Sequence, residues 1–164
     1  MTKWFGLSLL LIAAQSCGIY SPYGASTSGA KTCSVAPFDP VNPYVSASAA
    51  LALTESLRDR IQRQSTLRLV DEAGELNYRA EVIDWHIAPI NIQGDETAAA
   101  NRLTIKVEVH YENTLEPELS VDKVFSRFAD YTSDQDLTSV EDALVEDIGE
   151  QLSQDIFNAT LGNW

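Results

Sequence analysis

The sequence is poor in the residues from which active sites and metal sites are usually built. It has two histidines, His86 and His110, and two cysteines, Cys17 and Cys33. It contains no nucleophile elbow, no glycine-rich phosphate loop and no His-Glu-x-x-His motif. It also has no Cys-x-x-Cys pair or Cys/His cluster that would bind zinc. We therefore predict a protein that is not an enzyme and that needs no metal and no other cofactor.

Weaker patterns of the same kind are better explained as surface residues. Asp84 and His86 fall on one face of a predicted strand, but two ligands do not make a metal site. His110 lies on the polar face of another strand. The acidic residues of the last predicted helix lack the glycine-kinked loop of a calcium site. The glycosylation pattern that starts at Asn158 lies within that helix, so we discount it.

Basic residues are scarce as well. The chain has 11 Lys and Arg against 24 Asp and Glu, which gives a net charge of −13 at pH 7. A strongly acidic chain disfavours non-specific binding to nucleic acid and to anionic membrane surfaces. We predict no nucleic-acid partner. Hydrophobic residues make up 45% of the chain, which is typical of a globular protein.

An apolar run at the start of the chain indicates where the protein is sent. Lys3 precedes a run over residues 4–14, about half of the roughly 20 residues that span a bilayer. Small residues and a cysteine follow, as in a secretory signal. The tetrad Ala14-Gln15-Ser16-Cys17 resembles a bacterial lipobox, in which the cysteine is lipidated and the chain is cut just before it. We predict a lipoprotein signal peptide at residues 1–16 and lipid attachment at Cys17. The alternative is an ordinary cleaved signal with an incidental cysteine.

The two cysteines therefore have different expected roles. Residues 17–30 are rich in glycine, serine and threonine, which predicts an extended tether between the lipid and the folded body. With Cys17 lipidated, Cys33 has no partner for an internal disulfide. We predict that Cys33 is a buried strand residue that behaves as a small hydrophobe. The alternative is an intermolecular or reactive thiol.

Two helices are predicted from apolar residues that recur every fourth position. The first helix has a cap at Ser46 or Ser48. The last helix begins with a capping box from Thr138 to Glu141. The apolar stripes are Leu53, Leu57 and Ile61 in the first helix, and Val140, Leu144, Ile148, Leu152 and Ile156 in the last.

Strand patterns fill most of the remaining chain. Long strands are predicted at 76–92, 101–113 and 119–131, with short extended segments at 31–36 and 66–70. The 76–92 strand changes its apolar phase midway, which predicts a bulge, and Pro89 predicts an edge or a bulge. We predict a single α+β domain at residues 31–164, in which two helices pack on one face of a mostly antiparallel sheet of about four strands, in the order β-α-β-β-β-β-α.

Several stretches taken together resemble a known family. They are CGIYS from Cys17, the strand NRLTIKVEVHYEN, the segment VFSRFADY and the end SVEDALVEDIGEQLSQDIFN with its closing NW. In this order they are similar to the LptE family, over residues 17–164. The resemblance implies a lipoprotein held by its lipid on the periplasmic side of the outer membrane. Such a protein assembles one to one with the β-barrel LptD and plugs it while lipopolysaccharide passes to the outer leaflet. Gly18 is no acidic retention signal, which fits this destination.

Two questions stay open at the level of sequence. Basic side chains bind lipopolysaccharide in some members of the family, and the basic residues of the strands are Arg79, Arg102, Lys106, Lys123 and Arg127. Ordinary surface charge is the alternative, so we assign no lipopolysaccharide-binding residues. The competing function is a stand-alone periplasmic lipoprotein that binds a lipid or glycan through the exposed face of its sheet. Such a protein would have a pocket and would be a monomer with affinity for that ligand.

Overall fold

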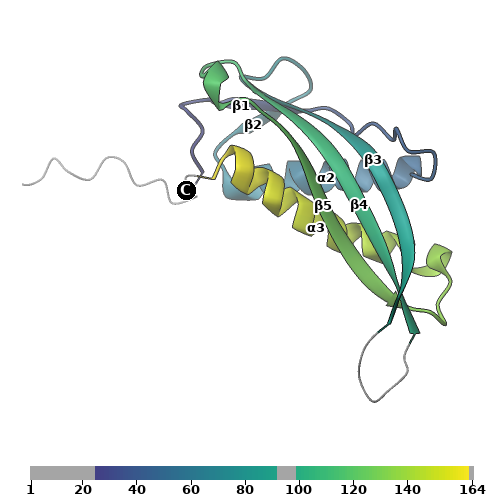
Figure 1. The fold of residues 1–164 in the computed structure, drawn as a ribbon. Coiled ribbons are helices and arrows are strands. Elements are labelled where there is room, and N and C mark those ends of the chain that lie inside the picture. The colour runs from purple at the N-terminus through teal and green to yellow at the C-terminus, as the bar shows by residue number, and fades with distance from the viewer. Residues whose placement is uncertain (1–24, 92–98, 163–164) are drawn as a thin grey trace, which may run out of the picture.

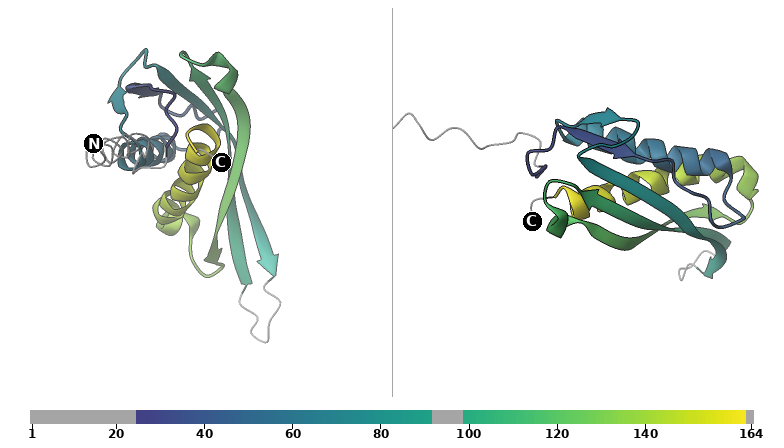
Figure 2. Two further views of the ribbon diagram at one scale, coloured as in Figure 1. Left: turned by 90° about the vertical axis from the view of Figure 1, so that its left-hand side faces the viewer. Right: turned by 90° about the horizontal axis from the view of Figure 1, so that it is seen from above.

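The computed structural model describes residues 25–91 and 99–162, which form two layers (Figure 1). Both helices pack on one face of a single sheet that curves around them (Figure 2). This confirms the predicted α+β fold with two helices on one face. The elements are β1 (Thr32–Val35), α2 (Ala47–Gln64), β2 (Arg68–Val70), β3 (Leu76–Asn91), β4 (Ala99–Asn113), the 3-10 helix η2 (Pro117–Leu119), β5 (Val121–Thr132) and α3 (Leu137–Thr160).

The N-terminal predictions fall in the part of the chain that the structure leaves out. The signal peptide at residues 1–16, the lipid-attachment residue Cys17 and most of the 17–30 tether lie outside the described residues. Within the described ranges, neither helix has the length and apolar character needed to cross a bilayer.

The sheet has five strands in the order β2-β1-β3-β4-β5. β3, β4 and β5 form an antiparallel meander, as predicted. β1 pairs in parallel with both β2 and β3, a pairing that the sequence pattern leaves open. The α2 crossover returns the chain to the same end of the sheet and makes β2 parallel to β1. The connection from β2 then crosses β1 to the same end again, so β3 is parallel to β1 as well. The described sheet thus has five strands where about four were predicted, and β2, in the segment predicted to be extended at 66–70, is its short edge strand.

The predicted bulge lies in the middle of β3. The pairing of β3 with β4 shifts register between Val82 and Asp84. Val82 is buried before the shift and Trp85 after it, so the core-facing phase changes at Ile83. One edge of β3 pairs with β4. On its other edge, the last hydrogen bond among the described residues is the one that the Asn42 amide donates to the Val82 carbonyl, and Pro89 lies beyond it. The predicted edge position of Pro89 is confirmed.

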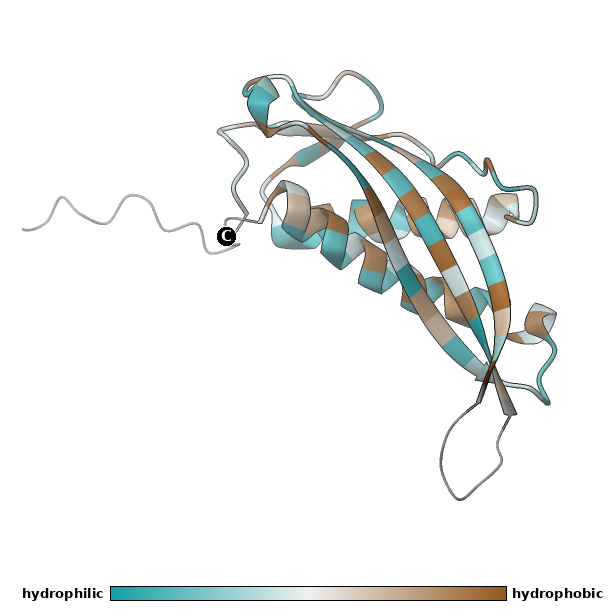
Figure 3. Ribbon diagram, in the orientation of Figure 1, coloured by the Kyte–Doolittle hydropathy of each residue, from teal (hydrophilic) through white to brown (hydrophobic). Residues whose placement is uncertain are grey.

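The core lies between the helices and the sheet. α3 packs against β4 and β5, α2 packs against β1 and β2, and the two helices pack against each other. Alternation along β4 is visible as alternating apolar and polar residues in Figure 3. Its buried side chains are Leu103, Ile105, Val107, Val109 and Tyr111. Burying one such side chain stabilises the fold by about 1.5–3 kcal/mol relative to leaving it exposed, which explains why the periodicity predicts this face correctly.

The helix caps agree with the sequence in one case and differ in the other. The Ser46 hydroxyl accepts the Ala49 amide at 3.1 Å, so the predicted cap of α2 is confirmed. α3 begins at Leu137, and its cap is Asp136, whose carboxylate accepts the Thr138 amide at 3.2 Å. The predicted capping box from Thr138 to Glu141 is wrong. An aspartate caps a helix at least as well as a threonine, so the helix starts earlier.

The connection from β2 to β3 passes directly over the backbone of β1. A Cβ atom at Gly74 would lie 2.6 Å from the Ser34 nitrogen and 2.9 Å from the Cys33 carbonyl carbon. Glu75, the next residue, stabilises the crossing. Its carboxylate accepts hydrogen bonds from the Lys31 amide at 2.6 Å and from the Thr32 amide at 3.1 Å. These hydrogen bonds lower the pKa of Glu75. The crossing thus requires a residue without a side chain at position 74.

Cys33 lies in the middle of β1, between β2 and β3, with 0% of its surface exposed. Its predicted burial is confirmed. Burial raises the pKa of the thiol to about 12, so the thiolate is scarce at neutral pH. We expect no reaction of Cys33 with Ellman's reagent in the folded protein and complete reaction in denaturant. An exposed Thr132→Cys variant serves as the reactive control. Native labelling of Cys33 at the rate of the control would contradict this assignment.

Candidate functional site

One face of the β3–β5 meander is left uncovered. Both helices lie on the other face, and no described element covers this one (Figure 2). We call it the open face and define it by the side chains that alternate away from the core in register. These are Arg79, Glu81, Asp84, His86 and Ala88 of β3, Arg102, Thr104, Lys106, Glu108, His110 and Glu112 of β4, and Asp122, Val124, Ser126, Phe128 and Asp130 of β5.

The best-organised part of the open face is a cluster of Arg102, Phe128 and Asp130. The Arg102 guanidinium donates two hydrogen bonds to the Asp130 carboxylate, at 2.7 and 2.8 Å. It also lies over the Phe128 ring, 3.6 Å from the centroid. The ion pair lowers the pKa of Asp130, through the hydrogen bonds from Arg102 first. Phe128 is 45% exposed. The cluster therefore presents an aromatic ring and an arginine, both held in fixed positions, to the outside.

Sequence reasoning missed the outward position of Phe128. The sequence predicted a strand at 119–131 without assigning Phe128 to either face. In the structure Phe125 and Tyr131 are buried and Phe128 is not. The spacing along the strand indicates this difference. Phe128 is an odd number of residues from both Phe125 and Tyr131, so its side chain points to the opposite face of the strand. The pairing of Arg102 with Asp130 had no such signal, because it depends on the register of β4 against β5.

The predicted basic candidates do not converge on one site. Arg79, Arg102 and Lys106 lie on the open face, and Lys106 pairs with Asp84 at 3.0 Å. Arg127 lies on the helix side of β5, where its guanidinium donates to the Asp155 carboxylate of α3, at 2.7 Å for one of the two bonds. Lys123 is on that side too, 5.4 Å from the Phe125 ring centroid. Three of the five are thus already paired with carboxylates.

The two histidines also have ordinary surroundings. His110 faces Asp122 across the strand pair, with Nδ1 2.8 Å from a carboxylate oxygen. His86 lies opposite Thr104, and its sequence partner Asp84 is held by Lys106. In residues 25–91 and 99–162, no three His, Cys, Asp or Glu side chains are grouped in a way that could hold a metal ion.

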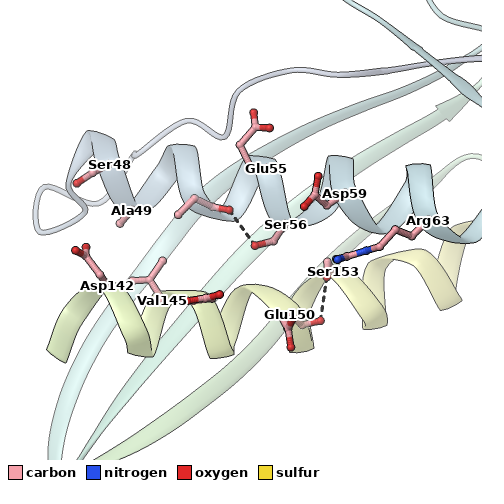
Figure 4. A pocket seen from close by; sticks show the side chains of 12 residues that line it. Ser48, Ala49, Glu55, Ser56, Asp59, Arg63, Asp142, Val145, Glu150 and Ser153 are labelled. Atoms are coloured by element: carbon pink, nitrogen blue, oxygen red, sulfur yellow. Dashed lines mark hydrogen bonds between the residues drawn. The ribbon is translucent and has the colours of Figure 1, made fainter.

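A groove runs between α2 and α3 on the side away from the sheet (Figure 4). Its volume is about 350 Å³, and its lining includes carboxylates from both helices. They are Glu55, Asp59, Asp142, Glu146 and Glu150, and Arg63 is the one basic residue of this lining. The helices approach closely at Gly149, where a Cβ atom would lie 2.7 Å from the Ser56 hydroxyl. A negatively charged groove disfavours an anionic ligand.

The comparison with protein families decides the classification. Residues 30–160 match the family model LptE, described as lipopolysaccharide-assembly. The chain belongs to the LptE family. The family assignment from the sequence motifs is thereby confirmed, and it places the chain among the lipoproteins of the cell envelope that serve lipopolysaccharide assembly.

A solved structure shares the fold of this chain at low sequence identity. The chain resembles a putative neuraminyllactose-binding hemagglutinin homolog from Helicobacter pylori with a TM-score of 0.51, at 9% identity, covering 87% of this chain and 88% of that one. This likeness shows a common fold. The rare lipoprotein B of Shewanella oneidensis is 15% identical over 79% of this chain and 92% of that one, with a TM-score of 0.49. The comparison with curated protein sequences finds no match.

Proposed function

We propose that this LptE-family chain is a non-enzymatic subunit of the lipopolysaccharide translocon. It is anchored by a lipid on Cys17 to the periplasmic side of the outer membrane. It assembles one to one with the LptD barrel and plugs the barrel lumen while lipopolysaccharide passes to the outer leaflet. The open face is the surface that contacts the barrel wall. The observation that carries this proposal is a long sheet face without helix cover, bearing a rigid arginine–aromatic cluster.

The shape and chemistry of the open face support a protein partner. β4 has 15 residues, about 50 Å at the usual rise per residue, which exceeds the ~30 Å hydrocarbon core that a barrel lumen crosses. The face mixes charges of both signs with two exposed apolar side chains, Val124 and Phe128. Arginine and aromatic residues are enriched among the side chains that dominate protein–protein binding energy. A face of this kind suits a polar protein wall.

The competing function, a stand-alone lipoprotein that binds a lipid or glycan, has less support. Such a protein needs a pocket that suits its ligand. The groove between α2 and α3 is lined by carboxylates, which repel an anionic glycolipid. Arg102, Lys106 and Arg127 are engaged with Asp130, Asp84 and Asp155 respectively. Both features favour a subunit whose role is assembly with a partner.

Purification from detergent-solubilised native membranes tests the proposal. The tag belongs at the carboxyl end after a spacer. Gly162 is bridged to Ala25 in the folded body, and the spacer keeps the tag away from this contact. We expect a large outer-membrane barrel in a ratio of about one to one. Recovery of a lone, lipid-anchored monomer would contradict the subunit role and would turn the search to bound lipid.

A further inference from the structure

The turn between β4 and β5, residues 114–120, holds two exposed leucines in a well-defined conformation. Leu115 is 47% exposed and Leu119 is 45% exposed. The turn is organised by Asn113, a buried side chain whose carbonyl oxygen accepts the amides of Leu115 at 3.0 Å and Glu116 at 2.9 Å. The Leu119 amide donates to the Glu116 carbonyl at 3.0 Å and closes η2. The two leucines are therefore presented to the outside by a fixed turn.

This turn lies at the end of the molecule where the tether enters. The Ser28 hydroxyl donates to the Glu116 carboxylate at 2.8 Å, which ties the turn to the first described residues. Ala25 forms an antiparallel bridge with Gly162, directly after α3. Figure 1 shows the start of the described chain, the end of α3 and the β4–β5 turn together at one end of the molecule. The β3–β4 end of the meander lies at the opposite end.

The length of the tether restricts how far this end lies from a lipid on Cys17. Ser28 follows Cys17 by 11 residues. A fully extended chain of this length spans at most roughly 36–40 Å. The end that carries Leu115 and Leu119 is therefore held close to the membrane surface, whereas the far end of the meander is not.

We propose that the 114–120 turn is a membrane-contacting tip, in which Leu115 and Leu119 enter the interface of the leaflet that holds the lipid anchor. This inference rests on the proposed lipidation of Cys17. Tethering raises the effective concentration of the tip at the surface, so a small apolar contact is sufficient. Two ends of the molecule then have different surroundings, with the tip in lipid and the rest of the meander free for a protein partner.

The charges around the tip define the kind of surface that it suits. Glu118 is exposed between the two leucines, and Glu112 and Asp122 are exposed nearby on β4 and β5. These carboxylates repel anionic headgroups, so the contact is apolar and favours a zwitterionic surface. Added anionic lipid is therefore expected to weaken the contact of the tip.

Quenching by nitroxide lipids measures the contact directly. The full lipidated protein, carrying Glu118→Cys labelled with an environment-sensitive dye, is placed in phosphatidylcholine vesicles that contain nitroxide-labelled lipid. Cys33 is buried and does not compete for the dye. The reference probe is Ala143→Cys, an exposed position near the start of α3. We expect several-fold stronger quenching at position 118 than at position 143, and weaker quenching when phosphatidylglycerol is added.

Matched variants separate the contribution of the two leucines to quenching from that of the tether. In the Glu118→Cys background, Leu115→Ser with Leu119→Ser should reduce quenching at least twofold. Val124→Ser should leave it unchanged, because Val124 is equally exposed but lies on the open face. Equal quenching at positions 118 and 143, or no effect of the leucine substitutions, would overturn the proposed tip.

Three further outcomes show which part of the proposal fails. If the protein floats with the vesicles but the probe at position 118 is not quenched, lipid anchoring stands and the tip is overturned. If the probe becomes shielded only when the barrel is reconstituted as well, the turn contacts the partner protein and the lipid assignment is overturned. A Cys17→Ala variant, which lacks the proposed lipid-attachment residue, should not float with the vesicles. If the wild-type protein does not float either, the anchoring itself fails, and the tip proposal fails with it.

Discussion

Replacing Phe128 by alanine should make the proposed complex with the LptD barrel dissociate about thirtyfold faster. The substitution removes an exposed ring on which the Arg102 guanidinium is stacked, and truncating a central arginine–aromatic anchor costs about 2 kcal/mol of binding free energy. Such losses appear mostly in the dissociation rate. The measurement is the rate at which unlabelled wild-type subunit displaces a dye-labelled variant from the purified complex. The folded subunit should be little affected, since Phe128 is only half buried.

Neighbouring substitutions serve as controls for this prediction. Val124→Ala removes a side chain of similar exposure from the same face of the same strand, without a stacked arginine, and should change the exchange rate less than threefold. Arg102→Lys keeps the charge but loses the paired hydrogen bonds to Asp130, so it should resemble Phe128→Ala more than wild type. An unchanged rate for Phe128→Ala would remove this part of the open face from the interface.

Gly74→Ala should destabilise the subunit by about 3 kcal/mol, the upper end of what overpacking costs. The new methyl group would meet the backbone of β1 at Ser34 and Cys33, together with the Leu76 carbonyl oxygen at 2.8 Å. Backbone atoms in a sheet cannot rotate away as a side chain can, so the crossing connection itself has to move. The free energy of unfolding from urea titrations, followed by circular dichroism, measures the effect.

Gly29→Ala is a useful comparison for Gly74→Ala. Gly29 has a positive φ of 80°, and a Cβ atom there would have no neighbour within 4 Å. Alanine at this position suffers backbone strain alone, which is worth about 1–2 kcal/mol. A loss for Gly74→Ala no larger than that for Gly29→Ala would show that β1 and the crossing connection adjust easily.

The sequence predicts those parts of the fold whose signal is repeated along one element. The alternation of β4 and the four-residue stripes of α2 and α3 each involve several buried side chains, so a shift of one residue would expose them all. The bulge in β3 followed from the same logic, because apolar residues changed phase between Val82 and Trp85. The order and type of these elements were therefore predictable from periodicity.

The parts that escaped prediction depend on contacts between distant segments. β1 has four residues, too few for a pattern that distinguishes parallel from antiparallel pairing. The open-face cluster requires Arg102 and Asp130 to fall in register across a strand pair. The groove between the helices requires the close approach at Gly149, which no periodicity indicates. Residue types were visible at each of these positions, but their neighbours were not.

The place of β1 in the sheet has a consequence for the order in which the chain acquires its structure. Both neighbours of β1 come later in the chain: Thr32 pairs with Arg68, and Cys33 pairs with Leu76. A chain that becomes available for folding from its amino end leaves both edges of β1 unpaired until residues 68–78 follow. The meander and α3, by contrast, are built from segments that follow one another directly. The carboxyl-terminal half can therefore form first, and β1 is the last strand to be locked in place.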